Sequence, residues 1–317
     1  MITNCRPYAG TADLQAMLNL LIAARPIDRI TDYPSIVDLQ EMAGTAEVQA
    51  RTLLWEDNDH QLLAFAIIHN PYNHLIFEIA PQAVGYDALE EEIIAWGVKQ
   101  LQSAARKNNG SIKLKTSCRD YNTERMTLLK RHGFVPLPIP TLHLSRSLDE
   151  PIPLPQLPDG FNVRHVAGEE EVEAYVALHQ AAFGAQNMTV EYRLSMMRTP
   201  DYDPELDLIA VAPDGRLAAF CVCHISQEEN ARTGRNDGYT DPVGTHPDFQ
   251  RQGLARALLL TGLHLLKQRG MDHALLSTLR ENIPMQRAAA SAGFCLQSTT
   301  IFFEKDIRKN LRQVRRY

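Results

Sequence analysis

The stretch YTDPVGTHPDFQRQGLAR, residues 239–256, decides the fold of the second half of the chain. Its first part reads as the end of a strand over 238–245, and a long helix is predicted over about 251–269 after a short turn. Pro242 and Gly244 interrupt the strand, because proline donates no ladder hydrogen bond and glycine often marks a bulge or a close backbone approach. We therefore expect a strand that stops pairing with its neighbour here and leaves backbone groups free for a ligand.

Small residues stand where the helix begins. Gln250, Gly253 and Ala255 fit a Gln/Arg-x-x-Gly-x-Gly/Ala loop. The first N–H groups of a helix have no intrahelical partner, and the helix dipole adds partial positive charge there. This geometry predicts a cradle for a pyrophosphate, to which Arg251 and Arg256 would add charge.

Outward from this stretch, the chain reads as a duplication. Three pairs of segments match in the same order, which predicts two copies of one unit with insertions in the loops. The matching segments are 122–134 with 282–294, 6–10 with 164–168, and 64–69 with 219–224. A proline-rich stretch, DEPIPLPQLPDG, lies between the copies. We therefore predict a first domain over 1–148, an extended linker over 149–160 and a second domain over 161–317.

Each copy alternates strands and helices, which predicts a layered α/β or α+β fold. In the second copy, strands are expected at 161–166, 206–212, 216–225, 238–245 and 272–278, with two more near 294–298 and 300–305. Helices are expected at 168–183, 188–198, 251–269 and 283–292.

Composition excludes several classes of protein. The formal net charge of −6 argues against binding nucleic acid through bulk phosphate attraction. No window approaches the ~18 apolar residues needed to cross a bilayer, and the start lacks the features of a signal peptide. Five scattered cysteines form no disulfide framework, so a reduced, cytoplasmic protein without membrane attachment is expected. Histidine spacing predicts no metal site, and the hydrolase, NTPase and dinucleotide-binding motifs are missing.

Residues 243–259, VGTHPDFQRQGLARALL, resemble the acetyl-CoA-binding motif of the GNAT superfamily of N-acetyltransferases. The segment from Asn282 to Phe294 resembles the next block of that superfamily, and the similarity covers most of 160–305. The resemblance implies two tandem GNAT-like domains, each with a mixed, mostly antiparallel sheet flanked by helices, an arrangement similar to that of mycothiol synthase-like members. The first copy resembles a degenerate version of the domain, because acidic residues stand where a pyrophosphate would lie (Asp87, Glu90, Glu91 and Glu92).

The resemblance also implies roles for single residues. Backbone groups would bind the pantetheine arm and the pyrophosphate of acetyl-CoA, and Asn282 would lie beside the arm. The arm would run along Val243, Gly244 and Thr245, and the pyrophosphate would be held by Gln250, Arg251, Gln252, Gly253, Leu254 and Ala255. Asp241 stands where many members carry a general base, although a carboxylate at the edge of a strand or in a turn is the alternative interpretation.

One position departs from the family pattern. Many members have a tyrosine seven residues after the asparagine, which protonates the departing thiolate, and here that position is Ala289. Tyr239 and Ser291 are alternative donors that the sequence does not rank.

The main hypothesis is an acetyl-CoA-dependent N-acetyltransferase that transfers acetyl directly to a small amine in its second domain, as a monomer or homodimer. The alternatives are a catalytically silent acyl-CoA-binding or sensing protein and an acetyltransferase of peptide or protein N-termini. An acidic segment would favour a cationic amine if it lines the acceptor site, but a solvated acidic surface is the favoured interpretation for each residue. Its members are Glu191, Asp201, Asp203, Glu205 and Asp207.

Overall fold

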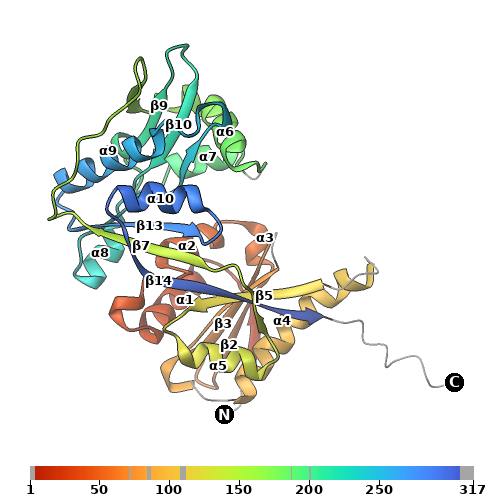
Figure 1. Ribbon diagram of the computed structural model, residues 1–317. Coiled ribbons are helices and arrows are strands. Elements are labelled where there is room, and N and C mark those ends of the chain that lie inside the picture. Colours follow the sequence, from red (N-terminus) through yellow and green to blue (C-terminus); the bar gives the residue numbers. More distant parts are fainter. Residues whose placement is uncertain are drawn as a thin grey trace. The chain divides into compact units, whose positions relative to one another are not determined.

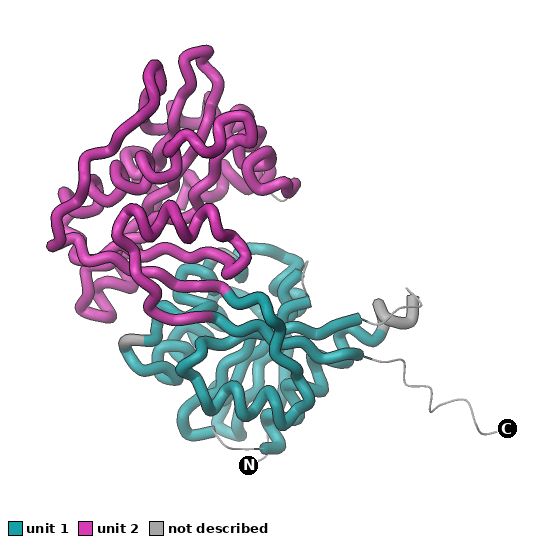
Figure 2. Tube along the Cα trace, viewed as in Figure 1, with its two compact units in different colours: residues 1–140, 300–317 teal, residues 141–299 magenta. Residues whose placement is uncertain are grey.

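The computed structural model describes residues 4–307, except 71–72, 84–86, 108–111, 187 and 200. It divides into two compact units, coloured separately in Figure 2. Unit 1 comprises residues 1–140 and 300–317, and unit 2 comprises residues 141–299. None of the helices in the described ranges is long and apolar enough to cross a membrane.

Unit 1 is a sheet with helices on both faces (Figure 1). Its strands follow the order β1-β2-β3-β4-β5-β14, and the neighbours are antiparallel except β4 and β5. Helices α1 and α2 supply the apolar side chains on one face, and α4 supplies those on the other. The strands are β1 Asn4–Pro7, β2 Thr52–Glu56, β3 Leu62–His69, β4 His74–Ile79, β5 Ile112–Arg119, β6 Val135–Pro136 and the second part of β14 Cys295–Ile307. The helices are α1 Thr11–Ala24, α2 Ile36–Ala43, α3 Ala46–Gln49, α4 Asp87–Lys107 and α5 Thr123–Arg131.

Unit 2 contains two groups of strands. One is a four-stranded antiparallel sheet of order β12-β10-β9-β8, and the other is the run β7-β13-β11. Helix α9 packs against one face of the four-stranded sheet and α6 against the other. The strands are β7 Thr141–Ser147, β8 Asn162–His165, β9 Asp207–Val211, β10 Leu217–Val222, β11 Asp237–Tyr239, β12 Val243–Thr245 and β13 His273–Leu279. The helices are α6 Val172–Phe183, α7 Val190–Met197, α8 Gln227–Thr233, α9 Leu254–Gln268 and α10 Ile283–Ser291.

Equivalent contacts in the two units follow the duplicated segments. Arg6 binds the Asp13 carboxylate seven residues later, and Arg164 binds Glu171 at the same spacing. Asn122 caps α5 by accepting from the N–H three residues on, and Asn282 caps α10 in the same way. The motifs from which the duplication was predicted therefore contain residues whose hydrogen bonds start or anchor helices.

The last strand of each copy belongs to the other unit. β7, from the end of the first copy, pairs with β13 in unit 2. Residues 300–307 of β14, from the end of the second copy, pair with β5 in unit 1. The compact units thus divide the chain differently from the predicted boundaries at 148 and 161, which describe sequence copies and stay a prediction.

The expected mixed fold with mostly antiparallel sheets and flanking helices is confirmed. Three element predictions were wrong. The strand predicted over 238–245 is two strands, β11 and β12; the two strands near 294–298 and 300–305 are the single strand β14; and helix α8 was not predicted. Helix α8 is short and polar, so it lacks the apolar periodicity from which a helix is recognised.

Candidate active site

The site is created where the chain leaves one group of strands for the other. β11 pairs in parallel with β13 up to Tyr239 and Leu275, whereas β12 pairs with β10 in the four-stranded sheet. The residues between them, Thr240 to Pro242, carry the chain across, and Thr240 N–H still donates to Leu275 O at 2.9 Å. Proline and glycine in this strand indicated the break correctly, but not that the two halves enter different groups of strands.

The backbone of β12 turns one edge toward β10 and the other edge away from it. Val222 N–H donates to Pro242 O and His246 N–H donates to Ala218 O, so 242, 244 and 246 face β10. Because alternate residues of an antiparallel strand direct their backbone groups to opposite sides, Val243 and Thr245 face away. The resemblance assigned the pantetheine arm to Val243, Gly244 and Thr245; the backbone groups of Val243 and Thr245 lie on the edge away from β10, whereas those of Gly244 face β10.

Gly244 has a different reason for being glycine. It is buried, and a Cβ built on it would lie 2.4 Å from the Phe220 ring and 3.0 Å from Ala182. Packing against an aromatic ring of the sheet therefore requires glycine at this position, whether or not a ligand approaches on the other side.

Helix α9 begins directly after this strand with an open N-terminus. Gly253 is its N-cap, with φ of +85°, and no side chain caps the first N–H groups. The first turn contains no acidic residue. Helices α5, α7, α8 and α10, by contrast, are all capped by an Asn, Thr or Ser side chain. The start of α9 is therefore free to bind an anion through backbone N–H groups and the helix dipole.

The loop residues around Gly253 differ in what their side chains do. Gln250, Arg251 and Gln252 are exposed, and Gln250 Nε2 donates to Thr245 O at 3.4 Å, which ties the loop to β12. Leu254 is buried in the core, so only its backbone is available to a ligand, and Ala255 is partly buried. The exposed, uncapped backbone is compatible with the predicted pyrophosphate site, which stays a prediction.

Asn282 and Arg256 have structural partners. Asn282 Oδ1 accepts from Met285 N–H at 3.2 Å as the N-cap of α10, and Arg256 Nε donates to Ser291 O at 3.3 Å. The sequence assigned both residues to the cofactor, and the hydrogen bonds show that each also holds α10 in place.

Asp241 lies at the break between β11 and β12. Its Oδ2 accepts from Ser277 N–H at 3.1 Å, so the carboxylate takes the place of a backbone partner where β13 and the crossing strand separate. Burial raises the pKa of Asp241 from 3.8 to about 6, and the Ser277 N–H opposes the rise only in part. A carboxylate with this pKa is largely ionised at neutral pH and is a stronger base than an exposed aspartate.

The two proton donors considered from the sequence are already engaged. Tyr239 OH donates to Glu229 Oε2 at 2.9 Å, and burial raises the pKa of the phenol. Ser291 Oγ donates to Ala288 O at 2.8 Å within its own helix. Ala289, at the usual tyrosine position, is fully buried in the core beneath α10.

A polar pair that the sequence analysis missed lies next to Asp241. Ser277 Oγ and His143 Nδ1 are hydrogen-bonded at 3.0 Å, and the two residues lie opposite each other on the paired strands β13 and β7. No sequence signal pointed to His143, because β7 comes from the first copy and only the strand exchange brings it into unit 2.

Three of the five acidic residues between 191 and 207 are paired with arginines. Asp203 and Glu205 both bind Arg269, and Asp207 binds the fully buried Arg193. Tyr202 OH also donates to Asp207 Oδ2 at 2.7 Å. These three carboxylates hold the loop together, so they give little support to an acidic lining for a cationic acceptor.

Comparison with known protein families identifies one domain of the chain. Residues 172–294 match the acetyltransferase (GNAT) family. The chain carries a GNAT acetyltransferase domain. The match lies wholly within unit 2 and includes β11, β12, α9 and α10. GNAT proteins are N-acetyltransferases with acetyl-CoA as co-substrate, and at this level the predicted family, enzyme class and co-substrate are confirmed.

Relatives extend the similarity over most of the chain. A mycothiol acetyltransferase of Acidothermus cellulolyticus is 27% identical over 300 residues, which cover 88% of this chain and 89% of that protein. A mycothiol acetyltransferase of Arthrobacter sp. is 26% identical over 259 residues, covering 75% of this chain and 79% of that protein.

Solved structures show the fold of both units. A GCN5-related N-acetyltransferase from Sphaerobacter thermophilus superposes with a TM-score of 0.71 at 24% identity and covers 96% of both chains. A tandem GNAT protein from the clavulanic acid biosynthesis pathway also gives 0.71, at 16% identity, over 97% of this chain and 99% of that one. The expected tandem GNAT fold is thereby confirmed.

Proposed function

We propose that unit 2 transfers acetyl from acetyl-CoA to a small amine, and that this takes place in the cytoplasm. The observation that carries the proposal is the strand break. It places the Asp241 carboxylate beside the free backbone edge of β12, in a strand that leads directly into the uncapped start of α9. One continuous segment thus offers a base, a backbone edge for the pantetheine arm and an anion site for the pyrophosphate.

Asp241 acts as the general base in this proposal. The acceptor ammonium gives one proton to the carboxylate, directly or through one water, and the neutral amine nitrogen attacks the thioester carbonyl. The C–S bond then breaks, the acetyl group stays on the nitrogen, the nitrogen releases its second proton to solvent, and the CoA thiolate leaves. Holding both reactants in one site supplies a large part of the rate, because orientation replaces a bimolecular encounter.

The leaving thiolate requires a proton that Ala289 has no group to supply. We assign that proton to the pair of His143 and Ser277, whose hydrogen-bonded side chains lie on the strands next to Asp241. This assignment is supported by the engagement of Tyr239 and Ser291 in other hydrogen bonds.

The acceptor is proposed to be a small molecule related to mycothiol, because the relatives that span most of the chain are named mycothiol acetyltransferases. The test is a thiol-release assay with acetyl-CoA and a panel that contains the deacetylated form of mycothiol, simple amino sugars and peptides with free N-termini. Acceptor-dependent CoA release and an acetylated product identify the enzyme and its substrate class. Preference for peptides would move the assignment to the N-terminal acetyltransferases.

A catalytically silent acyl-CoA-binding protein remains the competing hypothesis, favoured by the buried Ala289. Calorimetric titration with acetyl-CoA distinguishes the two when read beside the assay. Saturable binding without CoA release for any acceptor identifies a binder, and no binding at millimolar acetyl-CoA refutes both.

A further inference from the structure

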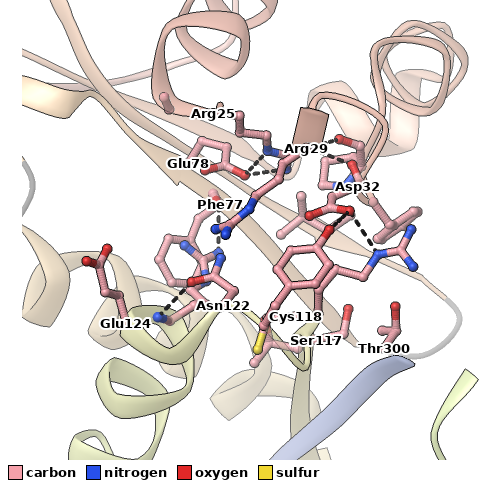
Figure 3. Close-up of a pocket in the computed structure, with 18 of the residues that line it drawn as sticks. Arg25, Arg29, Asp32, Phe77, Glu78, Ser117, Cys118, Asn122, Glu124 and Thr300 are labelled. Carbon is pink, nitrogen blue, oxygen red and sulfur yellow. Dashed lines mark hydrogen bonds and ion pairs between the residues drawn. The ribbon is translucent and has the colours of Figure 1, made fainter. Parts of the chain in front are cut away.

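Unit 1 contains a polar cavity of about 510 Å³, which is large enough for a small metabolite. It lies between β4 and β5, beside the start of α5, and all its lining residues belong to unit 1 (Figure 3). Four arginines line it, Arg25, Arg29, Arg119 and Arg125. Three carboxylates accompany them, those of Asp32, Glu78 and Glu124.

Two of the arginines are neutralised within the wall. Arg25 forms an ion pair with Glu78 and also donates to the carbonyls of Asp32 and Pro34. Arg119 Nε lies 2.9 Å from Asp32 Oδ1, and Tyr121 OH donates to the same oxygen at 2.6 Å. These pairs fix the shape of the cavity and contribute no net charge to it.

The other two arginines are held by aromatic rings. The Arg125 guanidinium lies 3.3 Å from the centroid of the Phe77 ring and donates to Phe77 O at 2.7 Å. The Arg29 guanidinium lies 4.6 Å from the centroid of the Tyr121 ring. Within the described residues, neither has a carboxylate at ion-pair distance. A guanidinium fixed by stacking keeps its N–H edge available for a carboxylate or phosphate.

Neighbouring groups do not cancel this charge. Burial lowers the pKa of His74 to about 4, so the imidazole is neutral at pH 7 and adds no competing cation. Burial also lowers the pKa of Arg125; the charge of Glu78 opposes this shift, but Glu78 is itself paired with Arg25. Glu124 lines the rim and is exposed to solvent, so water screens its charge.

The cavity lacks the features of the candidate site in unit 2. β4 pairs with β3 without interruption from His74 to Ile79, and by the same register the buried Leu75 takes the position that Asp241 has in unit 2. The first turn of α4 contains Asp87 and Glu90, and Arg131 is bound to both. A general base is therefore missing from this part of the described structure, and the helix start that would face a pyrophosphate is acidic.

We propose that this cavity binds a compact anion, a small carboxylate or phosphate compound, between Arg29 and Arg125. The two guanidinium groups form bidentate hydrogen bonds to it, and the ion-paired walls restrict its size. This inference does not rest on the function proposed for unit 2, because no residue of the candidate site in unit 2 takes part.

The test is calorimetric titration of the full chain with sodium phosphate and, separately, with citrate, at constant ionic strength and pH 7.5. The variants are Arg29→Gln and Arg125→Met, since the second repeat carries Met285 at the position of Arg125. Lys99→Gln is the matched control, because it removes one exposed positive charge from α4 outside the cavity. Arg29 is partly exposed, so its variant keeps the test valid if Arg125→Met fails to fold.

We expect one site per chain for phosphate or citrate, and which of them binds identifies the anion. Its dissociation constant should rise at least about tenfold in Arg29→Gln and Arg125→Met and stay unchanged in Lys99→Gln. The proposal would be overturned if neither anion showed saturable binding up to about 20 mM, or if all three variants left the binding unchanged. A parallel titration with acetyl-CoA gives a third such result: a second bound equivalent of acetyl-CoA that Arg125→Met abolishes.

Discussion

Replacing Asp241 by asparagine should lower the rate of acetyl transfer and stabilise the folded protein at the same time. The carboxylate is buried at the break between β11 and β12, and its pKa rises from 3.8 to about 6 because burial disfavours the ionised form. Asparagine keeps an oxygen that accepts from Ser277 N–H but carries no charge. A general base contributes about 10²–10⁴-fold to the rate, and we expect Asp241→Asn to lose a factor in this range.

The magnitude of the stabilisation follows from the same pKa. One pKa unit corresponds to about 1.36 kcal/mol, so ionising Asp241 in the folded protein costs about 3 kcal/mol at high pH. Since the folded-state pKa lies above the unfolded one, wild-type stability falls as pH rises from about 4 to about 6 and is constant above. Asp241→Asn should therefore gain up to about 3 kcal/mol at pH 8 and almost nothing at pH 4.

Two measurements test this reasoning. Urea unfolding of wild type and variant at pH 4, 5, 6 and 8 gives the stability difference, and kcat/KM for CoA release between pH 5 and 8.5 gives the rate profile. The wild-type rate should increase with pH through about 6, because only the ionised carboxylate accepts a proton. Asp59→Asn, which removes an exposed carboxylate in the turn between β2 and β3, should change neither profile.

The result that refutes the reasoning is specific. If Asp241→Asn is no more stable than wild type at pH 8, the carboxylate is not held in a desolvated site. If the stability difference appears but the rate and its limb near pH 6 survive, Asp241 is a buried structural carboxylate, and the alternative interpretation from the sequence is correct.

Three further predictions concern the backbone and the proton donor. Gly253→Ala should weaken acetyl-CoA binding about tenfold or more and lower the free energy of unfolding by roughly 1–2 kcal/mol, because φ is +85°. Gly215→Ala, at a glycine with the same φ, should lower the free energy of unfolding as much but leave binding unchanged. Calorimetric titration measures the binding, and urea unfolding measures the stability. Gly244→Ala should cost about 1–3 kcal/mol, since its Cβ would lie 2.4 Å from Phe220, and an unaltered melting temperature would contradict this packing. His143→Ala should lower kcat more than it raises KM, and an unchanged kcat would remove the residue from the proton path.

Sequence reasoning reached furthest where the signal is local. The Gly253 loop, the break near Pro242 and the asparagine that starts α10 are each written in a few adjacent residues, and the structure places a turn, a strand break and a helix cap there. Backbone sterics and capping act over such short distances, so a single sequence suffices to predict them.

The features that were missed depend on contacts between distant segments. The reason for Gly244 is the ring of Phe220 on a neighbouring strand, and the cavity of unit 1 is formed by segments from Ala24 to Thr300. The sequence gives no signal for Arg125, because no residue near it in the chain indicates that the Phe77 ring packs against its guanidinium. Packing of this kind follows from tertiary structure, which periodicity does not encode.

In the proposed mechanism, the strand exchange gives the first copy a part in the chemistry of the second. Ala289 is fully buried, so a tyrosine at that position would need space that the core beneath α10 does not have. A proton donor must then come from another element of the site, and the strand next to β13 is β7, which the first copy supplies. His143 on that strand is hydrogen-bonded to Ser277, whose backbone N–H donates to the Asp241 carboxylate. In the proposed mechanism the second copy alone would therefore hold the base without its acid, and the first copy would be needed for the strand that carries His143.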